Sequence, residues 1–275
     1  MSTEAKVSEH YGSGGLSERI LTALAEGGQA TERISADALF PFDQLHGRQL
    51  AATREHVGRL KLDPIKTVLD VGSGIGGPAR YMAFTFGCRV SGIDVTEAFV
   101  SAARDLTARC GLADRVKFEI GNALAMPFAD AQFDAAACQY VAMNIADKAG
   151  LLREINRVVK PGGQLVWSSV VAGAGEPRYP LPWARDPSVS FLVSQEALRA
   201  LFDAAGWRIL EWTDETDLFR SPPPPPAPAA RLMSTIVLGE DFAERIQNFA
   251  SNMQTGSLRS ILVLAERLRK IAVSC

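Results

Sequence analysis

The chain has 275 residues, of which 47% are hydrophobic, and this is enough to bury one large core with a small accessory cap. Its formal net charge of −2 comes without a cluster of Lys and Arg, which argues against nucleic acid as a partner. The cysteines form no C-x-x-C pair and no apolar run reaches the length of a membrane span, so we expect a cytoplasmic protein without a membrane partner.

Residues 1–60 are expected to form short helices that make an N-terminal lid over a core of residues 61–275. Apolar side chains at helical spacing share one face there: Leu16, Ile20, Leu21 and Leu24.

From about residue 65, short apolar runs alternate with helix-like segments, which is typical of βαβ units and a parallel sheet. Pro78 suits a first helical turn, Thr96, Asp147 and Ser194 suit helix N-caps, and the sequence KPGG at 160–163 is expected to stop a helix. The predicted strands cover residues 67–72, 88–94, 115–120, 133–140, 164–170 and 207–213. The predicted fold is therefore an α/β, doubly wound sheet.

Two insertions are expected on the substrate side, around residues 171–192 and 214–235. The second contains a polyproline stretch, interpreted as a spacer rather than a partner-binding motif. A helix is predicted after Asp241, with Phe242, Ile246 and Phe249 on one face. For residues 257–270, periodicity leaves open a helix or a last antiparallel strand.

The glycine-rich stretch Val68 to Tyr81 fits two patterns at once. Gly72, Gly74 and Gly77, with Asp94 further on, match a dinucleotide loop. Gly72, Gly74 and Gly76 also follow Asp70 in the acidic-x-Gly-x-Gly-x-Gly order of a loop that binds S-adenosylmethionine. The loop alone does not choose between these cofactors.

Four stretches that follow one another along the chain distinguish between the two cofactors: VLDVGSGIGGPARY, VSGIDVT, GNALAMPFADAQFDAAACQY and LLREINRVVKPGGQL. Together they resemble the motifs of class I S-adenosylmethionine-dependent methyltransferases, in the small-molecule branch that includes sterol, tocopherol, sarcosine and phosphoethanolamine methyltransferases. The resemblance covers roughly Thr67 to Val170. It implies a mostly parallel, seven-stranded Rossmann-like sheet with helices on both faces. It also implies in-line transfer of a methyl group to an O, N or C nucleophile of a small molecule, with S-adenosylhomocysteine as product.

The resemblance also implies roles for individual residues around the cofactor. Asp70 would orient the loop and the methionine ammonium, and Asp94 would accept both ribose hydroxyls. Asn122 stands where the family often has Asp and would meet the adenine amino group, while Gln139 would lie beneath the sulfonium or have a structural role. The remaining expected cofactor contacts are Gly72, Ser73, Gly74, Gly76, Val95 and Ala123.

His46 is the candidate general base, with packing or helix capping as the alternative. Tyr11 is expected to close over the methionine end or the acceptor, or else to be an ordinary surface tyrosine. The acceptor pocket is expected to draw mainly apolar and aromatic side chains from the lid, the insertion and the end of the fourth strand. These are Tyr11, Phe40, Phe42, Met143, Asn144, Tyr179, Trp183 and Phe191. Such a set suits an aromatic or terpenoid acceptor or a methylated ammonium, and no metal site is expected.

Alternatives to a small-molecule methyltransferase are a non-catalytic regulator or scaffold that binds S-adenosylmethionine and, less well supported, an NAD(P)-dependent oxidoreductase. A nucleic-acid methyltransferase is disfavoured because the chain lacks an Asn/Asp-Pro-Pro-aromatic motif and a Pro-Cys nucleophile. The oligomeric state, monomer or homodimer, stays open.

Overall fold

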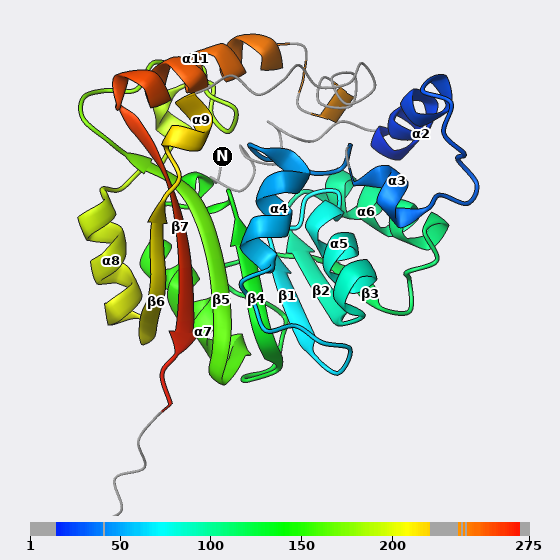
Figure 1. Ribbon diagram of the computed structural model, residues 1–275, viewed down its shortest axis with the longest axis horizontal. Coiled ribbons are helices and arrows are strands. Elements are labelled where there is room, and N and C mark those ends of the chain that lie inside the picture. The colour runs from blue at the N-terminus through cyan, green and yellow to red at the C-terminus, as the bar shows by residue number, and fades with distance from the viewer. Residues whose placement is uncertain (1–14, 41, 221–235, 238, 240, 270–275) are drawn as a thin grey trace, which may run out of the picture.

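The computed structural model describes residues 15–40, 42–220, 236–237, 239 and 241–269. Within them a single seven-stranded sheet has the order β3-β2-β1-β4-β5-β7-β6 (Figure 1). Strands β1 to β5 are parallel, and β7 runs antiparallel between β5 and β6. The strands are β1 (Thr67–Val71), β2 (Arg89–Asp94), β3 (Val116–Ile120), β4 (Phe133–Gln139), β5 (Val159–Ala172), β6 (Trp207–Asp214) and β7 (Leu258–Arg267). The predicted doubly wound, mostly parallel α/β fold is confirmed.

Helices cover both faces of the sheet (Figure 1). One buried cluster joins α4 (Gln49–Val57), α5 (Gly77–Phe86) and α6 (Glu97–Arg109) to the first face. The other joins α7 (Lys148–Val158) and α8 (Gln195–Ala204) to the second face. Strand β4 contributes the small residues Ala135, Ala136 and Ala137, all buried, so helices can approach it closely from both sides.

The helix boundaries follow the capping signals in the sequence. Pro78 lies in the first turn of α5, and Gly87 ends that helix with φ 72°. Asp147 and Ser194 each accept a hydrogen bond from a backbone N–H in the first turn of α7 and α8, from Gly150 and Ala197 respectively.

The N-terminal region is helical, with α2 (Leu16–Glu26) and α3 (Ala36–Leu39) before α4. Leu16, Ile20 and Leu24 are buried along one face of α2 and pack with Phe99 and Leu106 of α6. Whether residues 1–60 act as a lid stays a prediction.

The structure also corrects two sequence interpretations and settles one that was left open. The KPGG sequence lies inside β5 rather than ending α7, because the strand already begins at Val159. Residues 258–267 form β7, which settles the open choice in favour of an antiparallel strand. In α11 (Phe242–Thr255), Ile246 is 40% exposed, and the helix packs instead through a largely polar face: Arg245, Asn248, Phe249, Asn252 and Met253.

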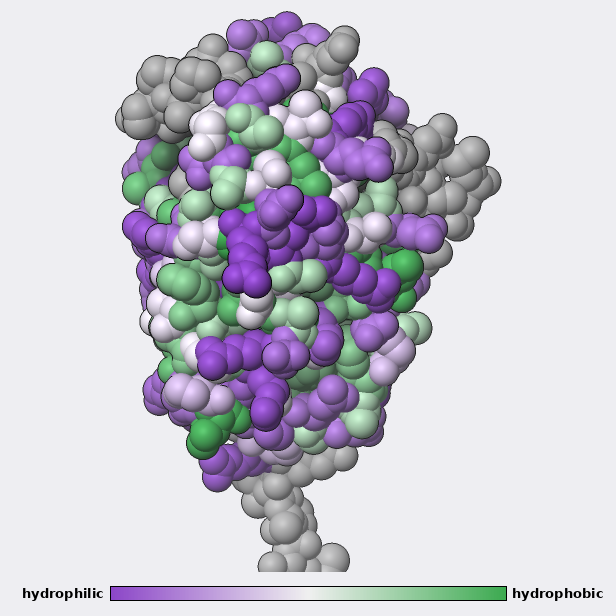
Figure 2. Space-filling view, turned by 90° about the vertical axis from the view of Figure 1, so that its right-hand side faces the viewer, coloured by the Kyte–Doolittle hydropathy of each residue, from purple (hydrophilic) through white to green (hydrophobic). Residues whose placement is uncertain are grey.

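Strand β3 is the sheet edge next to β2, and its exposed side chains include the charged Lys117 and Glu119. Charges on an edge strand oppose pairing with another chain. Polar side chains are spread over this side of the molecule, with apolar ones between them (Figure 2). Among the described residues, none of the helices combines the length and apolar character needed to cross a bilayer.

Candidate active site

The glycine loop joins β1 to α5 at the upper edge of the sheet in Figure 1, where the parallel strands end. Gly72, Gly74 and Gly76 have φ of 68°, 53° and 85°, values that favour glycine. A Cβ on Gly72 would lie 2.3 Å from Val141, and one on Gly76 would lie 2.5 Å from Phe118. The loop therefore keeps its shape through both backbone conformation and close packing, with backbone N–H groups of the α5 N-terminus beside it.

Gly77, the residue that completes the dinucleotide pattern, has a different reason to be glycine. A Cβ there would lie 2.2 Å from the carbonyl oxygen of Asp43. The segment before α4 thus passes directly over the start of α5, and Gly77 makes room for it.

Asp94 ends β2 and is half-buried beside the loop. Its Oδ2 accepts the Gly74 N–H at 2.9 Å, and its Oδ1 accepts the Thr96 N–H at 2.9 Å. Loss of solvent raises the pKa of this carboxyl. The two hydrogen bonds fix the Asp94 carboxylate at the carboxyl end of β2. This position is next to the point where the strand order reverses between β1 and β4, which is where doubly wound sheets bind their ligands.

Asp70 lies at the penultimate position of β1 and is 2% exposed. Its Oδ2 has no hydrogen-bond partner among the described residues, and neither does the buried Ser73 hydroxyl. Burial and the neighbouring charge of Asp94 raise the pKa of Asp70 to about 7. An unpartnered buried carboxyl oxygen fits a cationic ligand group such as an ammonium, so these residues fit S-adenosylmethionine.

Asn122 and Ala123 follow β3 and are half-buried. The side-chain oxygen of Asn122 accepts the Leu124 N–H at 2.8 Å, which fixes the turn. Val95, directly after Asp94, is also half-buried. The structure thus brings the predicted cofactor residues to the ends of β1, β2, β3 and β4 along one edge of the sheet.

Gln139, the last residue of β4, belongs to a hydrogen-bonded chain that the sequence did not predict. Its Nε2 lies 2.9 Å from Nδ1 of His56, and Nε2 of His56 lies 3.0 Å from Glu215. The three residues are 7%, 0% and 3% exposed. Arg48 lies 3.5 Å from the Glu215 carboxylate and completes the group.

Met143, Tyr179 and Trp183, which the sequence analysis assigns to an acceptor pocket, pack together in one apolar cluster. Asn144 and Phe191 support it through polar contacts, since the Asn144 amide donates to the Trp183 carbonyl and the Phe191 N–H donates to the Met143 carbonyl. The sequence missed the other aromatic members of the cluster, which are Tyr140, Phe219 of α9 (Asp217–Arg220) and Phe249 of α11.

These aromatic rings form a continuous row that starts beside Gln139. Ring centroids are 6.4 Å apart for Tyr140 and Phe219, 5.5 Å for Phe219 and Phe249, and 6.0 Å for Phe249 and Trp183. Tyr140 has φ 55°, a strained value for a tyrosine. The row leads from the cofactor loop to the insertion.

Phe40 and Phe42 do not belong to this aromatic cluster, which corrects the prediction. Phe40 is 4% exposed and packs edge-on against Tyr81 and Phe84 of α5. Phe42 packs with the cluster around α2. Both side chains serve to attach the N-terminal segment to the core. Tyr11 lies outside the described residues.

His46 stacks on Tyr140, with ring centroids 5.3 Å apart and an angle of 20° between the ring planes. Its Nε2 lies 3.0 Å from the Thr53 hydroxyl and its Nδ1 lies 3.1 Å from the Gly47 carbonyl oxygen. Burial lowers the pKa of His46 to about 4, so the ring is neutral at pH 7. Because both ring nitrogens face oxygen atoms of the chain, the contacts favour the packing alternative, and the general-base role stays a prediction.

The insertion after β5 is held by the polar face of α11. The side chains of Asn252, Asn248 and Arg245 donate to the carbonyl oxygens of Arg178, Pro180 and Pro182 at 2.8, 3.1 and 3.0 Å. Proline has no N–H to offer, so this segment bonds mainly through its carbonyls. We call this set of three contacts the α11 ladder; α11 itself lies beside α9 at the top of Figure 1.

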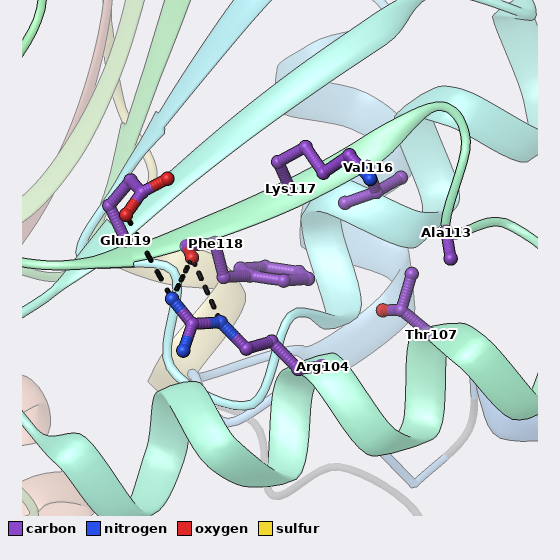
Figure 3. Close-up of a pocket in the computed structure, with 7 residues that line it drawn as sticks. All are labelled: Arg104, Thr107, Ala113, Val116, Lys117, Phe118 and Glu119. Atoms are coloured by element: carbon purple, nitrogen blue, oxygen red, sulfur yellow. Dashed lines mark hydrogen bonds and ion pairs between the residues drawn. The ribbon is translucent and has the colours of Figure 1, made fainter.

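A separate hollow of about 320 Å³ lies at the β3 edge, between this strand and α6 (Figure 3). Its Arg104 donates to the Phe118 carbonyl oxygen at 3.0 Å and lies 3.9 Å from Glu119. Because its Arg104 and Glu119 already form an ion pair and it lies away from the aromatic row, we do not assign it to the active site.

Comparison with known proteins agrees with this geometry. A family profile described as a methyltransferase domain matches residues 69–167. The O-methyltransferase resE of Aspergillus sclerotiorum is 31% identical over 222 residues, which are 78% of this chain and 81% of that protein.

Two solved structures match nearly the whole chain. The [4+2]-cyclase SpnF has a TM-score of 0.69 and 25% identity, with 98% of this chain and 97% of that chain covered. Geranyl diphosphate C-methyltransferase from Streptomyces coelicolor, in complex with S-adenosyl-L-homocysteine, has a TM-score of 0.70 and 18% identity, with 98% and 99% covered.

The glycine loop, the acidic residues at the strand ends and the strand order define a class I methyltransferase core. The chain belongs to the S-adenosylmethionine-dependent methyltransferases, and its cofactor is S-adenosylmethionine. It is an enzyme that methylates small molecules, which confirms the leading sequence interpretation over the non-catalytic and dinucleotide alternatives.

Proposed function

We propose that the protein methylates a hydroxyl group of an apolar, ring-bearing small molecule. The observation that carries this proposal is the row of aromatic rings, from Tyr140 to Trp183, that begins beside the predicted cofactor site. Oxygen as the attacked atom is supported by the name of the fungal O-methyltransferase that matches most of the chain.

When bound, S-adenosylmethionine supplies an electrophilic methyl group on a positively charged sulfur. The proposed roles of the protein are to bind and orient. Asp94 binds the ribose hydroxyls, Asp70 the methionine ammonium, and Asn122 the adenine amino group. The other proposed cofactor contacts are Gly72, Ser73, Gly74, Gly76, Val95, Ala123 and Gln139.

On the acceptor side, Met143, Tyr179 and Trp183 contribute apolar walls, while Asn144 and Phe191 hold the insertion in place. Alignment of acceptor and methyl group can supply roughly 7–11 kcal/mol of the barrier. Gly47 lies so close to α9 that a Cβ on it would be 2.5 Å from Phe219, so the segment before α4 closes this side of the row.

We also propose that the protein acts in the cytoplasm. The support for this location is that the described cysteines, Cys88, Cys110 and Cys138, are all free thiols.

An acceptor screen tests the proposal. Hydroxylated aromatic and terpenoid compounds are incubated with the protein and S-adenosylmethionine, release of S-adenosylhomocysteine is measured, and the product is examined by NMR. We expect a new O-methyl group. In Phe219→Ala we expect the KM for that acceptor to rise about tenfold, with unchanged cofactor affinity, because a ring of the row is lost.

Phe84→Ala is the matched control, since Phe84 is 51% exposed on α5 and distant from the row in sequence and packing. Methylation on nitrogen or carbon, or an equal KM in Phe219→Ala and the wild type, would contradict the proposal.

A further inference from the structure

Two buried oxygen acceptors that have no hydrogen-bond partner within the described part of the chain lie on one face of the sheet beside the glycine loop. They are Oδ2 of Asp70 and Oε1 of Gln139, on side chains that are 2% and 7% exposed. Asp70 is in register with Ala137 on the neighbouring strand. Since alternate residues of a strand point to the same face, Gln139 continues the face of Asp70 toward the strand ends.

The loop packs directly against the segment that follows Gln139. A Cβ on Gly72 would lie 2.3 Å from Val141, so the glycine loop and the end of β4 are in contact. The end of β4 at Gln139 therefore leads into a segment that contacts the glycine loop through Val141 and begins the aromatic row at Tyr140.

The hydrogen bonds that join His56 to Gln139 and Glu215 determine which atom of the Gln139 amide remains available to a ligand. The amide nitrogen can only donate, so Nδ1 of His56 accepts its hydrogen bond at 2.9 Å. The proton of His56 is then on Nε2, which donates to Glu215 at 3.0 Å. Because the amide nitrogen donates to His56, the carbonyl oxygen is the amide atom that lacks a partner among the residues with a described position.

The chemistry of the cofactor matches two such oxygens. The methionine part of S-adenosylmethionine carries two positive groups, an ammonium and a sulfonium, whereas S-adenosylhomocysteine carries the ammonium alone. An unpartnered buried acceptor is costly unless a donor or a cation meets it. Asp70 suits the ammonium, which both molecules have, and the Gln139 carbonyl suits the charge that only the methyl donor has.

We propose that Gln139 selects the charged methyl donor over its neutral product, and that His56 and Glu215 are positioning residues that hold its carbonyl oxygen toward the sulfonium. The inference rests on the proposed placement of the cofactor and assigns a function to two residues, His56 and Glu215, outside the glycine-loop motif. It also gives the enzyme a means of releasing S-adenosylhomocysteine after transfer.

Calorimetry on the ligand-free protein tests the proposal without an acceptor. Dissociation constants are measured for S-adenosylmethionine, S-adenosylhomocysteine and sinefungin, whose amine places a positive charge near the position of the sulfonium. In Gln139→Leu we expect the two charged ligands to bind about tenfold more weakly and S-adenosylhomocysteine to stay within about twofold of the wild type.

Two further variants test the positioning residues and the charge. In His56→Leu the Gln139 amide loses its anchor, and we expect the preference for S-adenosylmethionine over S-adenosylhomocysteine to fall about threefold or more. In Gln139→Glu, which keeps an oxygen at the site and adds a negative charge, the preference should be at least that of the wild type. If Gln139 had a purely structural role, its replacement by Leu would weaken the binding of all three ligands to the same extent.

Gln164→Leu is the control, because Gln164 is a similarly buried glutamine, 8% exposed, within β5 and in register with Ala135 near the start of β4 rather than with Gln139 at its end. We expect its ligand preference to equal that of the wild type. Equal weakening of all ligands in Gln139→Leu, or no weakening, would overturn this inference. Failure of the wild type to bind either S-adenosyl compound would instead overturn the proposed cofactor site.

Discussion

Asp94 accepts hydrogen bonds from two backbone N–H groups in the ligand-free protein, so its carboxylate is already fixed for the contact with the ribose hydroxyls that we propose. We expect Asp94→Ala to weaken binding of S-adenosylhomocysteine about a hundredfold, because hydrogen bonds to a charged group are lost and the loop loses its tie to β2. Calorimetry measures this. Asp203→Ala, at an exposed position of α8, should bind normally, and unchanged affinity in Asp94→Ala would refute the ribose role.

Asp70 makes the stability of the ligand-free protein depend on pH. Burial and the charge of Asp94 raise its pKa from 3.8 to about 7. Between these values the folded protein holds a proton that the unfolded chain has lost, so folding stability falls as pH rises, by about 1.4 kcal/mol per unit for one such group. Above about pH 7 the full penalty is present.

Asp70→Asn removes this titration. We therefore expect the stability advantage of Asp70→Asn over the wild type to grow from pH 4 to pH 7 and then to level off. Urea unfolding of both proteins at unit steps of pH measures it. A constant difference across this range would show that the Asp70 carboxyl is not desolvated.

At the residue scale, candidate site residues could be predicted from the sequence only where a motif specifies their position along the chain. Asp70 and Asp94 could be found because they stand at fixed places around a glycine loop. His56 and Glu215 are 159 residues apart, and each is an isolated polar residue in its own segment. Only the fold brings them together, by placing α4 and the end of β6 over the end of β4.

The α11 ladder gives a prediction at the scale of an element. Asn252 both donates to the Arg178 carbonyl and accepts the Arg178 N–H, each at 2.8 Å. Asn252→Leu should release the insertion and cost about 1–3 kcal/mol of stability, since buried backbone groups lose their partners. We expect trypsin to cleave after Arg178 several times faster, as read by mass spectrometry.

Asn156→Leu serves as the comparison for that experiment. Asn156 also donates to a backbone carbonyl, that of Gly206, but far from the insertion. Cleavage after Arg178 should stay slow in this variant. Equal cleavage rates in wild type and Asn252→Leu would mean that the ladder does not hold the segment.

Among the elements, those with a clear pattern were predicted and those shaped by distant partners were not. The parallel strands are short apolar runs between glycine and helix signals, so they could be read directly. The polar face of α11 contradicts the usual rule that a helix packs through its apolar side. Its reason is the row of carbonyls in a proline-rich segment more than sixty positions earlier, which no local pattern reveals.

At the scale of the whole molecule, one buried ion pair joins the N-terminal segment to the core. Arg80 of α5 binds Asp43 at 2.8 Å, and their side chains are 0% and 2% exposed. Asp43→Ala leaves the guanidinium buried without its carboxylate, so we expect a loss of about 3–5 kcal/mol of unfolding free energy. Denaturant unfolding measures it.

The double variant Asp43→Ala/Arg80→Met completes that test. With both charges gone, we expect it to be more stable than Asp43→Ala alone, because an apolar side chain replaces an unpaired charge. If the losses measured for Asp43→Ala and for Arg80→Met alone simply add in the double variant, the pair does not couple the N-terminal segment to α5.

The α11 ladder also bears on how this enzyme can evolve. Its side chains donate hydrogen bonds to main-chain carbonyls of the insertion, and every residue type has such a carbonyl. Side chains along residues 178–182 can therefore change while the course of the backbone is kept. Because this insertion borders the aromatic row that we propose contacts the acceptor, we expect related enzymes to differ in acceptor through this segment while the sheet and the glycine loop stay the same.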